Sequence, residues 1–166
     1  MKQNIIGDTA AMLLLIIMVG VVASLFLSTA DSNVQTRLKD KTISYVDNAR
    51  TMGKLTPAAY MAYLNSIHNC GEFEAQIKIV RDVSYNSGSD IVADTIILSE
   101  SELISYMFPD AGADRSYILN SGDRVYACVR RTGAGLTSLA SLFGQGGKKG
   151  DLICEYSGQV LHDGRY

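Results

Sequence analysis

Residue types on which many enzymes and metalloproteins depend are scarce in this chain of 166 residues, which has no Trp, two Pro, two His and three Cys. No two cysteines form a CxxC pair, which argues against a zinc site or a thioredoxin-type site. The histidines are His68 and His162, and no GxSxG motif marks a nucleophile for either to activate. The sequence therefore predicts no catalytic residue, no cofactor and no metal, and a protein that is not an enzyme.

Signals for binding phosphate, calcium or nucleic acid are missing as well. The glycine-rich stretch 144–150 matches neither GxGxxG nor the Walker pattern. Acidic residues gather in predicted loops, at Asp82, Asp90, Asp94, Asp110 and Asp114. Their spacing does not match a calcium-binding loop, so we expect solvated carboxylates. The formal net charge is −2 and no dense basic patch occurs, which argues against a nucleic-acid partner.

Charge is absent from Thr9 to Ala30, an apolar stretch of 22 residues. A helix rises about 1.5 Å per residue, so the stretch covers about 33 Å, enough to cross a hydrocarbon core of about 30 Å. The alternative is a secretory signal peptide, whose apolar core has about 7 to 15 residues. We expect a retained anchor, with residues 1–30 forming the transmembrane or filament-core segment.

Helical spacing continues beyond the apolar stretch. Apolar residues recur at intervals of three, four or seven positions, at Val34, Leu38, Tyr45, Ala49 and Met52. This spacing predicts one unbroken helix from about Asp8 to about Met52, with Gly53 as its C-terminal cap. Half of the helix would lie in lipid, and the other half would pack on a soluble head.

Residues 31–166 are predicted to form a single head, because about 135 residues suffice for one modest core and are too few for two. Thr56 and Pro57 open a second helix that closes near Gly71. Alternating side chains predict a strand at 73–79. Further strands are expected at 91–98, 123–131 and 151–161. The predicted fold class is α+β, a long N-terminal helix packed on an antiparallel sheet.

Two shorter helical features are predicted in the head. Ser99 and Glu102 form a capping-box pattern that opens a short helix before Pro109. Between the last two strands, apolar residues at helical spacing predict a brief amphipathic turn. They are Leu136, Leu139, Ala140 and Phe143.

The odd number of cysteines leaves at least one thiol free or paired between chains. They are Cys70, Cys128 and Cys154. Cys128 and Cys154 lie in predicted strands, so a bridge between them is an open alternative. Side-chain alternation nevertheless places them on faces that do not match. We therefore expect three small buried thiols.

Small residues occur every four positions within the apolar stretch, at Gly20, Ser24 and Ser28. Such a stripe lets another helix approach closely in lipid, which makes these residues candidates for helix packing and assembly. The alternative is that Gly and Ser are simply tolerated there.

The chain resembles the type IV pilin superfamily, and within it the Tad-type pilins and TadE-like pseudopilins of bacteria. The similarity is carried by IIGDTAAMLLLIIMVGVVASLFL, by TISYVDNARTMGKLTPAAYMAYL and by a β-rich C-terminal half. The resemblance implies a structural subunit or minor pseudopilin of a type IV or Tad-like pilus or related secretion filament. Its implied partners are further copies, other pilins, the membrane, and a pilus assembly platform with its ATPase. A membrane-anchored, extracytoplasmic binding or signalling module that does not polymerise is the alternative.

The resemblance also implies a candidate processing site. Pilins of this kind are usually cut after a Gly and carry Glu at the fifth mature position. Here Gly7 is the candidate Gly, Asp8 would be the first mature residue and Met12 the fifth. Met12 departs from the family pattern, and Asp8 offers a substitute charge near the membrane surface.

Charge near the apolar stretch bears on the location of the head. Lys2 precedes the stretch, whereas Arg37, Lys39 and Lys41 follow it, so a literal positive-inside count favours a cytoplasmic head. The pilin-like layout implies the opposite orientation. We expect a single-pass membrane protein with an extracytoplasmic head, which reaches the cell surface in an assembled filament.

Overall fold

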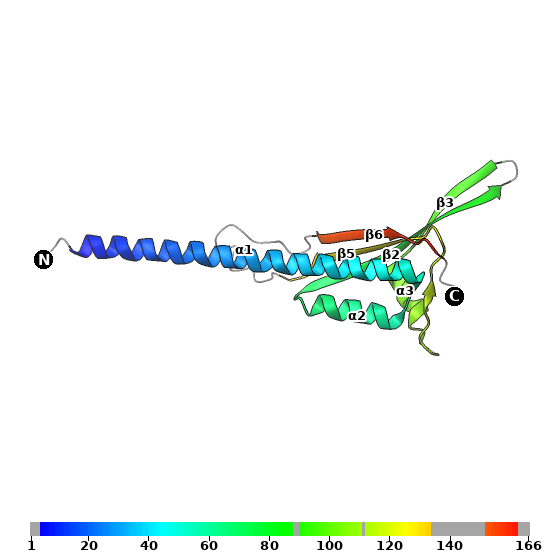
Figure 1. Ribbon diagram of the computed structural model, residues 1–166, viewed down its shortest axis with the longest axis horizontal. Helices are drawn as coiled ribbons and strands as arrows, with labels where there is room; N and C mark the ends of the chain where they lie inside the picture. The colour runs from blue at the N-terminus through cyan, green and yellow to red at the C-terminus, as the bar shows by residue number, and fades with distance from the viewer. Residues whose placement is uncertain (1–3, 88–89, 111, 134–151, 163–166) are drawn as a thin grey trace.

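One long helix is the main feature of the computed structural model, which describes residues 4–87, 90–110, 112–133 and 152–162. This helix, α1 (Asn4–Met52), carries the rest of the chain alongside its C-terminal half (Figure 1). Its 49 residues rise about 74 Å at about 1.5 Å each. The predicted unbroken helix is confirmed, with no interruption between Ala30 and Leu38.

Gly53 ends α1 because its φ of 63° is a left-handed conformation that favours glycine. The Gly53 carbonyl accepts a hydrogen bond from the Leu119 N–H at 2.9 Å. The chain then forms β1 (Lys54–Leu55), which pairs antiparallel with β4 (Tyr117–Ile118). The sequence predicts only a short link here, because strands of two residues are too short to show a period.

The second helix, α2 (Pro57–His68), begins where the sequence predicts. The Thr56 hydroxyl accepts the Ala59 N–H at 3.2 Å, and Pro57 occupies the first turn. One face of α2 is buried, at Tyr60, Tyr63 and Ile67.

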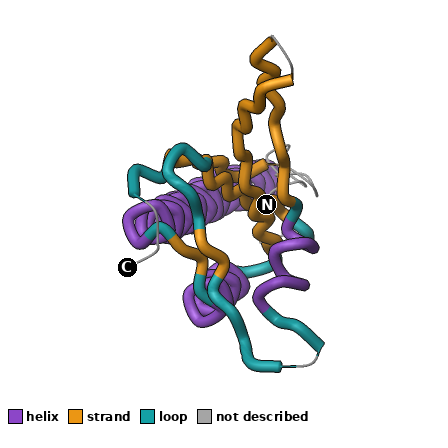
Figure 2. Tube along the Cα trace, turned by 90° about the vertical axis from the view of Figure 1, so that its right-hand side faces the viewer, coloured by secondary structure: helices purple, strands orange, loops and turns teal. Residues whose placement is uncertain are grey.

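The main sheet has the strand order β3-β2-β5-β6, and every neighbouring pair is antiparallel. Its strands are β2 (Phe73–Ser87), β3 (Asp90–Leu98), β5 (Arg124–Arg131) and β6 (Leu152–Gln159). Figure 2 views the molecule from the Met52 end of α1 and shows the β2 and β3 hairpin rising away from α1 and α2. The predicted α+β fold, a long helix packed on an antiparallel sheet, is confirmed.

The inner face of the sheet packs against α1 and α2 and forms the hydrophobic core of the head. On α1 the fully buried apolar residues begin at Leu38 and continue to Ala49. The alternation predicted for β2 and β5 is confirmed by their buried residues, which include Phe73, Ala75, Ile77, Ile79, Val125, Ala127 and Val129. Polar side chains between these positions face outward.

The short helix α3 (Glu100–Met107) follows β3, as predicted. The Ser99 N–H donates to the Glu102 carboxylate at 2.7 Å, and this hydrogen bond lowers the pKa of Glu102. The amphipathic turn predicted at 136–143 lies outside the described residues.

All three cysteines are free thiols. Cys128 lies opposite Glu155, while Cys154 lies opposite Val129, so the predicted mismatch of their faces is confirmed. The expectation of three buried thiols is wrong, because each is only partly buried. Cys128 projects from the outer face of the sheet and Cys70 follows the end of α2, where no second layer covers them fully.

Candidate functional site

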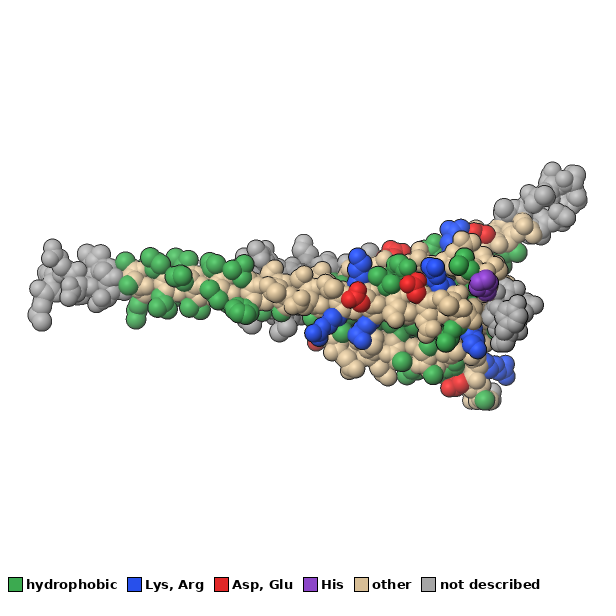
Figure 3. Space-filling view, in the orientation of Figure 1, with side chains coloured by type: hydrophobic (Ala, Val, Ile, Leu, Met, Phe, Trp, Pro, Cys, Tyr) green, Lys and Arg blue, Asp and Glu red, His purple; other side chains and the backbone are tan. Residues whose placement is uncertain are grey.

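The amino-terminal half of α1 exposes an unbroken apolar surface. Large apolar side chains from Met12 to Phe26 are each 49% to 74% exposed. None of the most apolar stretch of this helix is buried against the head, and by length and composition the helix can cross a membrane. On the face shown in Figure 3, hydrophobic side chains cover this half, whereas charged side chains gather on the head.

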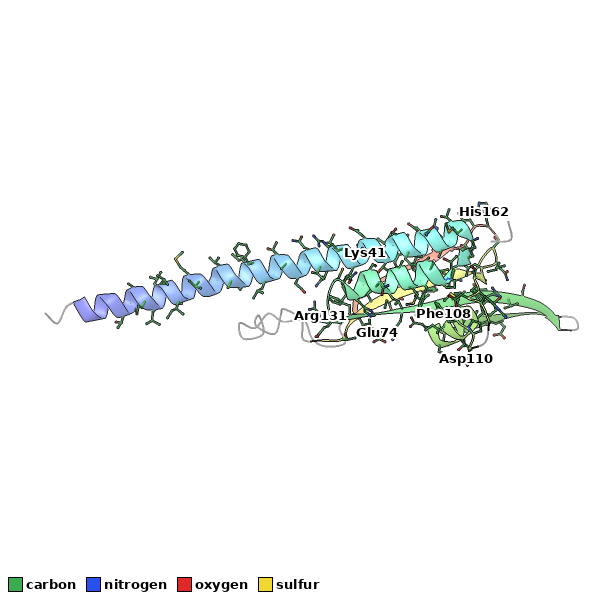
Figure 4. The ribbon with its side chains drawn as sticks, turned by 90° about the horizontal axis from the view of Figure 1, so that it is seen from below. Lys41, Glu74, Phe108, Asp110, Arg131 and His162 are labelled. Carbon is green, nitrogen blue, oxygen red and sulfur yellow. The ribbon has the colours of Figure 1, made fainter. Side chains whose placement is uncertain are left out.

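An ion pair marks the point at which α1 enters the head. Arg131 donates from Nη2 to Asp31 Oδ1 at 2.7 Å, and the two side chains are 3% and 22% exposed. The Arg131 guanidinium also lies over the Phe73 ring, 5.3 Å from its centroid. Figure 4 places Arg131 at the end of the head nearest the exposed half of α1. The contact fixes the helix to the sheet just beyond the apolar stretch.

The small residues predicted for helix packing all lie on the exposed half of α1. The Ser24 hydroxyl donates to the Val21 carbonyl at 2.8 Å, so its hydrogen bond is made within its own helix. Ser24, Asp31, Leu38 and Tyr45 follow one another at intervals of seven residues. A straight helix drifts only about 20° per seven residues. The stripe of Gly20, Ser24 and Ser28 therefore lies on the side of α1 that carries the head.

The candidate processing site, the Gly7–Asp8 bond, lies inside α1 close to its first residue. The surroundings of Gly7 and of the Asp8 side chain lie outside the described part of the structure. The structure therefore gives the backbone conformation of this site and leaves the processing hypothesis as a prediction.

A buried polar cluster joins α1, α2 and β6 within the head. The Tyr45 and Tyr63 rings stack with centroids 4.4 Å apart, and the Tyr63 and Thr42 hydroxyls lie 3.1 Å apart. The Cys154 thiol donates to the Thr42 hydroxyl at 3.5 Å. Burial raises the pKa of both tyrosines above its usual range, so both rings stay neutral. This cluster joins the two helices to each other and to β6.

A second polar contact lies near the far end of the head. Asp123 is 2% exposed and accepts hydrogen bonds from Arg81 Nε at 2.8 Å and from Arg81 Nη2 at 2.6 Å. Hydrogen bonding to Asp123 raises the pKa of Arg81. The sequence does not predict this pair, because 42 residues separate its partners and neither stands in a motif.

The other polar residues singled out in the sequence do not converge. His68 and His162 are exposed. Asp82 pairs with Arg124 at 2.6 Å on the outer face of the sheet. Among residues 4–87, 90–110, 112–133 and 152–162, no group of three or more His, Cys, Asp or Glu side chains could hold a metal ion.

A hollow of about 500 Å³ lies on the outer face of the sheet. Its lining mixes basic and acidic side chains, namely Lys78, Arg130, Glu100 and Glu155, with Ile97 and Tyr126. The Lys78 ammonium lies 5.0 Å from the centroid of the Tyr126 ring. The hollow is open and selects for no single charge.

Comparison with known proteins gives no relative: no protein-family model matches the chain, and no curated protein or solved structure matches it either.

Proposed function

We propose that the chain is a pilin-like structural subunit, major or minor, that assembles through the apolar half of α1. The observation that carries the proposal is the division of one unbroken helix. From Met12 to Phe26 its large side chains are apolar and exposed, and from Leu38 onward its apolar side chains are part of the core of the head. An anchor and a packing helix are thus the same rigid element.

The exposed apolar surface needs an apolar environment. Contiguous apolar surface of this extent is costly in water, because burial contributes about 25 cal/mol per Å². Lipid and a bundle of like helices are the two environments that satisfy every side of such a helix. Transfer from the first to the second would exchange lipid contacts for helix contacts without unfolding the head. This is the behaviour that a filament subunit requires.

A second candidate is a membrane-anchored binding or signalling module that does not polymerise. The 500 Å³ hollow on the outer face of the sheet is the observation that favours it. In that case α1 would remain in lipid as a single helix, and the small-residue stripe would contact no other copy.

The head is proposed to lie outside the cytoplasm, where a filament with a platform and ATPase at its base would present it. Asp114 is exposed in a loop of the head and suits a labelling test. With the three native cysteines replaced by Ser, Asp114→Cys should react with an impermeant maleimide in intact cells. Labelling that occurs only after permeabilisation would place the head in the cytoplasm and exclude the filament.

If copies assemble through the small-residue stripe, large side chains placed on it should impair assembly and leave membrane insertion intact. Replacing Gly20 and Ser24 by Leu should cost about 1 to 3 kcal/mol in each subunit contact by overpacking. Membrane insertion should survive, because Leu is at least as apolar as the residues it replaces. The matched control is Leu at Met18 and Val22, on the opposite face of α1. Sedimentation of detergent extracts and electron microscopy of sheared cells would measure assembly, and equal assembly of both double variants would rule out this helix face.

A further inference from the structure

The distal parts of β2 and β3 form a ribbon that no third strand supports. Pairing between the two strands begins at Ile79 opposite Leu98 and ends at Ser87 opposite Asp90. The neighbouring strand β5 ends its pairing with β2 at Val80. In the part of the chain that the structure describes, β3 pairs with β2 alone. Figures 1 and 4 show the ribbon extending past the Met52 end of α1.

The ribbon continues the inner face of the sheet beyond the helices that cover it. Side chains alternate along a strand, so Ile96 and Asp94 share the face of Leu98. Leu98 packs against the core, whereas Ile96 is 47% exposed and Asp94 is exposed. Over β2, β5 and β6 this face is covered mainly by α1 and α2, whereas Arg81, which pairs with Ile96 across the ribbon, is held by Asp123. A pair of helices is therefore the partner that this surface fits.

The head presents such a pair of helices on its outside. A groove of about 410 Å³ runs between α1 and α2, with the Tyr45 and Tyr63 side chains in its lining. Small side chains widen it, namely Ser44, Ala59, Ala62 and Ser66. An aliphatic side chain can enter a groove of this kind without displacing bulk.

Basic side chains at and beside the groove offer partners for an acidic side chain on the ribbon. Arg37 and Lys41 are exposed four residues apart on α1, and Lys41 lines the groove together with Asp40. Neither basic residue makes an ion pair within the described part of the chain, and neither does Asp94 on the ribbon. Opposite charges of this kind set the register and suppress wrong partners.

We infer that the β2–β3 ribbon of one copy docks on the α1–α2 groove of a second copy, with Ile96 against the small residues and Asp94 facing Arg37 and Lys41. The inference deepens the proposed function and rests on it. From Lys41 to Met52 α1 rises about 17 Å, and the ribbon reaches beyond Met52. Copies with parallel helices, staggered by about this distance or somewhat more, would bring the two surfaces level.

Photo-cross-linking of the full-length chain in membranes tests the contact. A benzophenone amino acid at Ile96 should form adducts with α1 at 37–48 or α2 at 58–66 of another copy, identified by mixing two differently tagged chains. The same probe at Ile97, which is 62% exposed on the opposite face, is the matched control. Adducts from Ile96 only within its own chain, or only to other surfaces, would overturn the inference.

Charge exchange provides a second measurement. Asp94→Lys and Lys41→Glu should each lower the yield from the Ile96 probe about five-fold, and the two changes together should restore it. Asp114→Lys, at an exposed position away from the ribbon, should leave the yield unchanged. Loss without restoration contradicts the pairing. A probe at Val21 on α1 separates the two proposals: adducts from Val21 without adducts from Ile96 remove this inference alone, and no adduct between copies from either removes both.

Discussion

At the scale of single residues, Asp31 marks the boundary between the exposed apolar half of α1 and the half that packs in the head. It is the first charged residue after the apolar stretch, and its partner Arg131 is 3% exposed. A buried guanidinium that loses its carboxylate is strongly unfavourable, so the pair resists separation. The head is thereby held at a fixed place on the helix, which the proposed filament would require of each copy.

Glu100 gives the head a pH dependence of defined sign. Its carboxylate accepts a hydrogen bond from the Tyr60 hydroxyl at 2.8 Å. Burial raises the pKa of the Glu100 carboxyl, and this hydrogen bond partly offsets the rise. The folded state therefore binds this proton more tightly than the unfolded state. The stabilisation is full below the unfolded pKa of about 4.3 and is lost as the pH rises through the folded pKa.

Glu100→Gln keeps a side-chain oxygen that can accept the hydrogen bond from Tyr60 and removes the negative charge of the carboxylate. We expect a higher Tm than wild type at about pH 7.5 and nearly the same Tm at about pH 3, which lies below the pKa of Glu100 in both states. Circular dichroism of the full chain in detergent micelles measures both values. A Tm that falls at the higher pH, or rises equally at both, would contradict the assignment.

At the scale of elements, the close approach of α1 to β6 depends on Gly158. A Cβ at this position would lie 2.8 Å from Arg50 Cδ and 3.3 Å from Val46 Cγ1, so the helix sits where a side chain would otherwise stand. The element that carries the anchor is thus seated directly on the sheet.

Gly158→Val should lower the free energy of unfolding of the head by about 1 to 3 kcal/mol, because its side chain must push α1 away from the sheet. Ser157→Val, on the exposed outer face one residue away, is the control and should change stability by less than about 0.5 kcal/mol. Urea titration followed by near-ultraviolet circular dichroism measures both, and equal costs would show that α1 is not seated at Gly158.

The elements also show what sequence periodicity can and cannot predict. The long helix and the strands β2 and β5 follow from spacing alone, because their buried positions repeat with the period of the element. The β1–β4 pair and the Arg81–Asp123 contact join residues far apart in the chain, and no local pattern records them. The distal ribbon of β2 and β3 has no third strand because β5 ends its pairing with β2 at Val80. The residues of the hairpin itself do not indicate where β5 ends.

At the scale of the whole molecule, assembly is proposed to use two surfaces on one rigid body. The small-residue stripe lies on the side of α1 that carries the head, and the ribbon and groove lie at different heights along the same axis. A neighbour that packs on the stripe would therefore also be positioned along the axis by its head. In the proposed assembly, the stripe is the contact on which the rest depends.

Cysteine cross-linking along α1 tests that contact most directly. In a chain whose native cysteines are replaced by Ser, single cysteines at Gly20, Ser24 and Ser28 are compared with single cysteines on the opposite face. The opposite positions are Met18, Val22 and Phe26. After oxidation in native membranes, cross-linked dimers should peak at positions 20, 24 and 28 and be low at 18, 22 and 26, the phase of a helix packed by one face. Uniformly low yields at all six positions would show that α1 crosses the membrane alone and would contradict assembly through this helix.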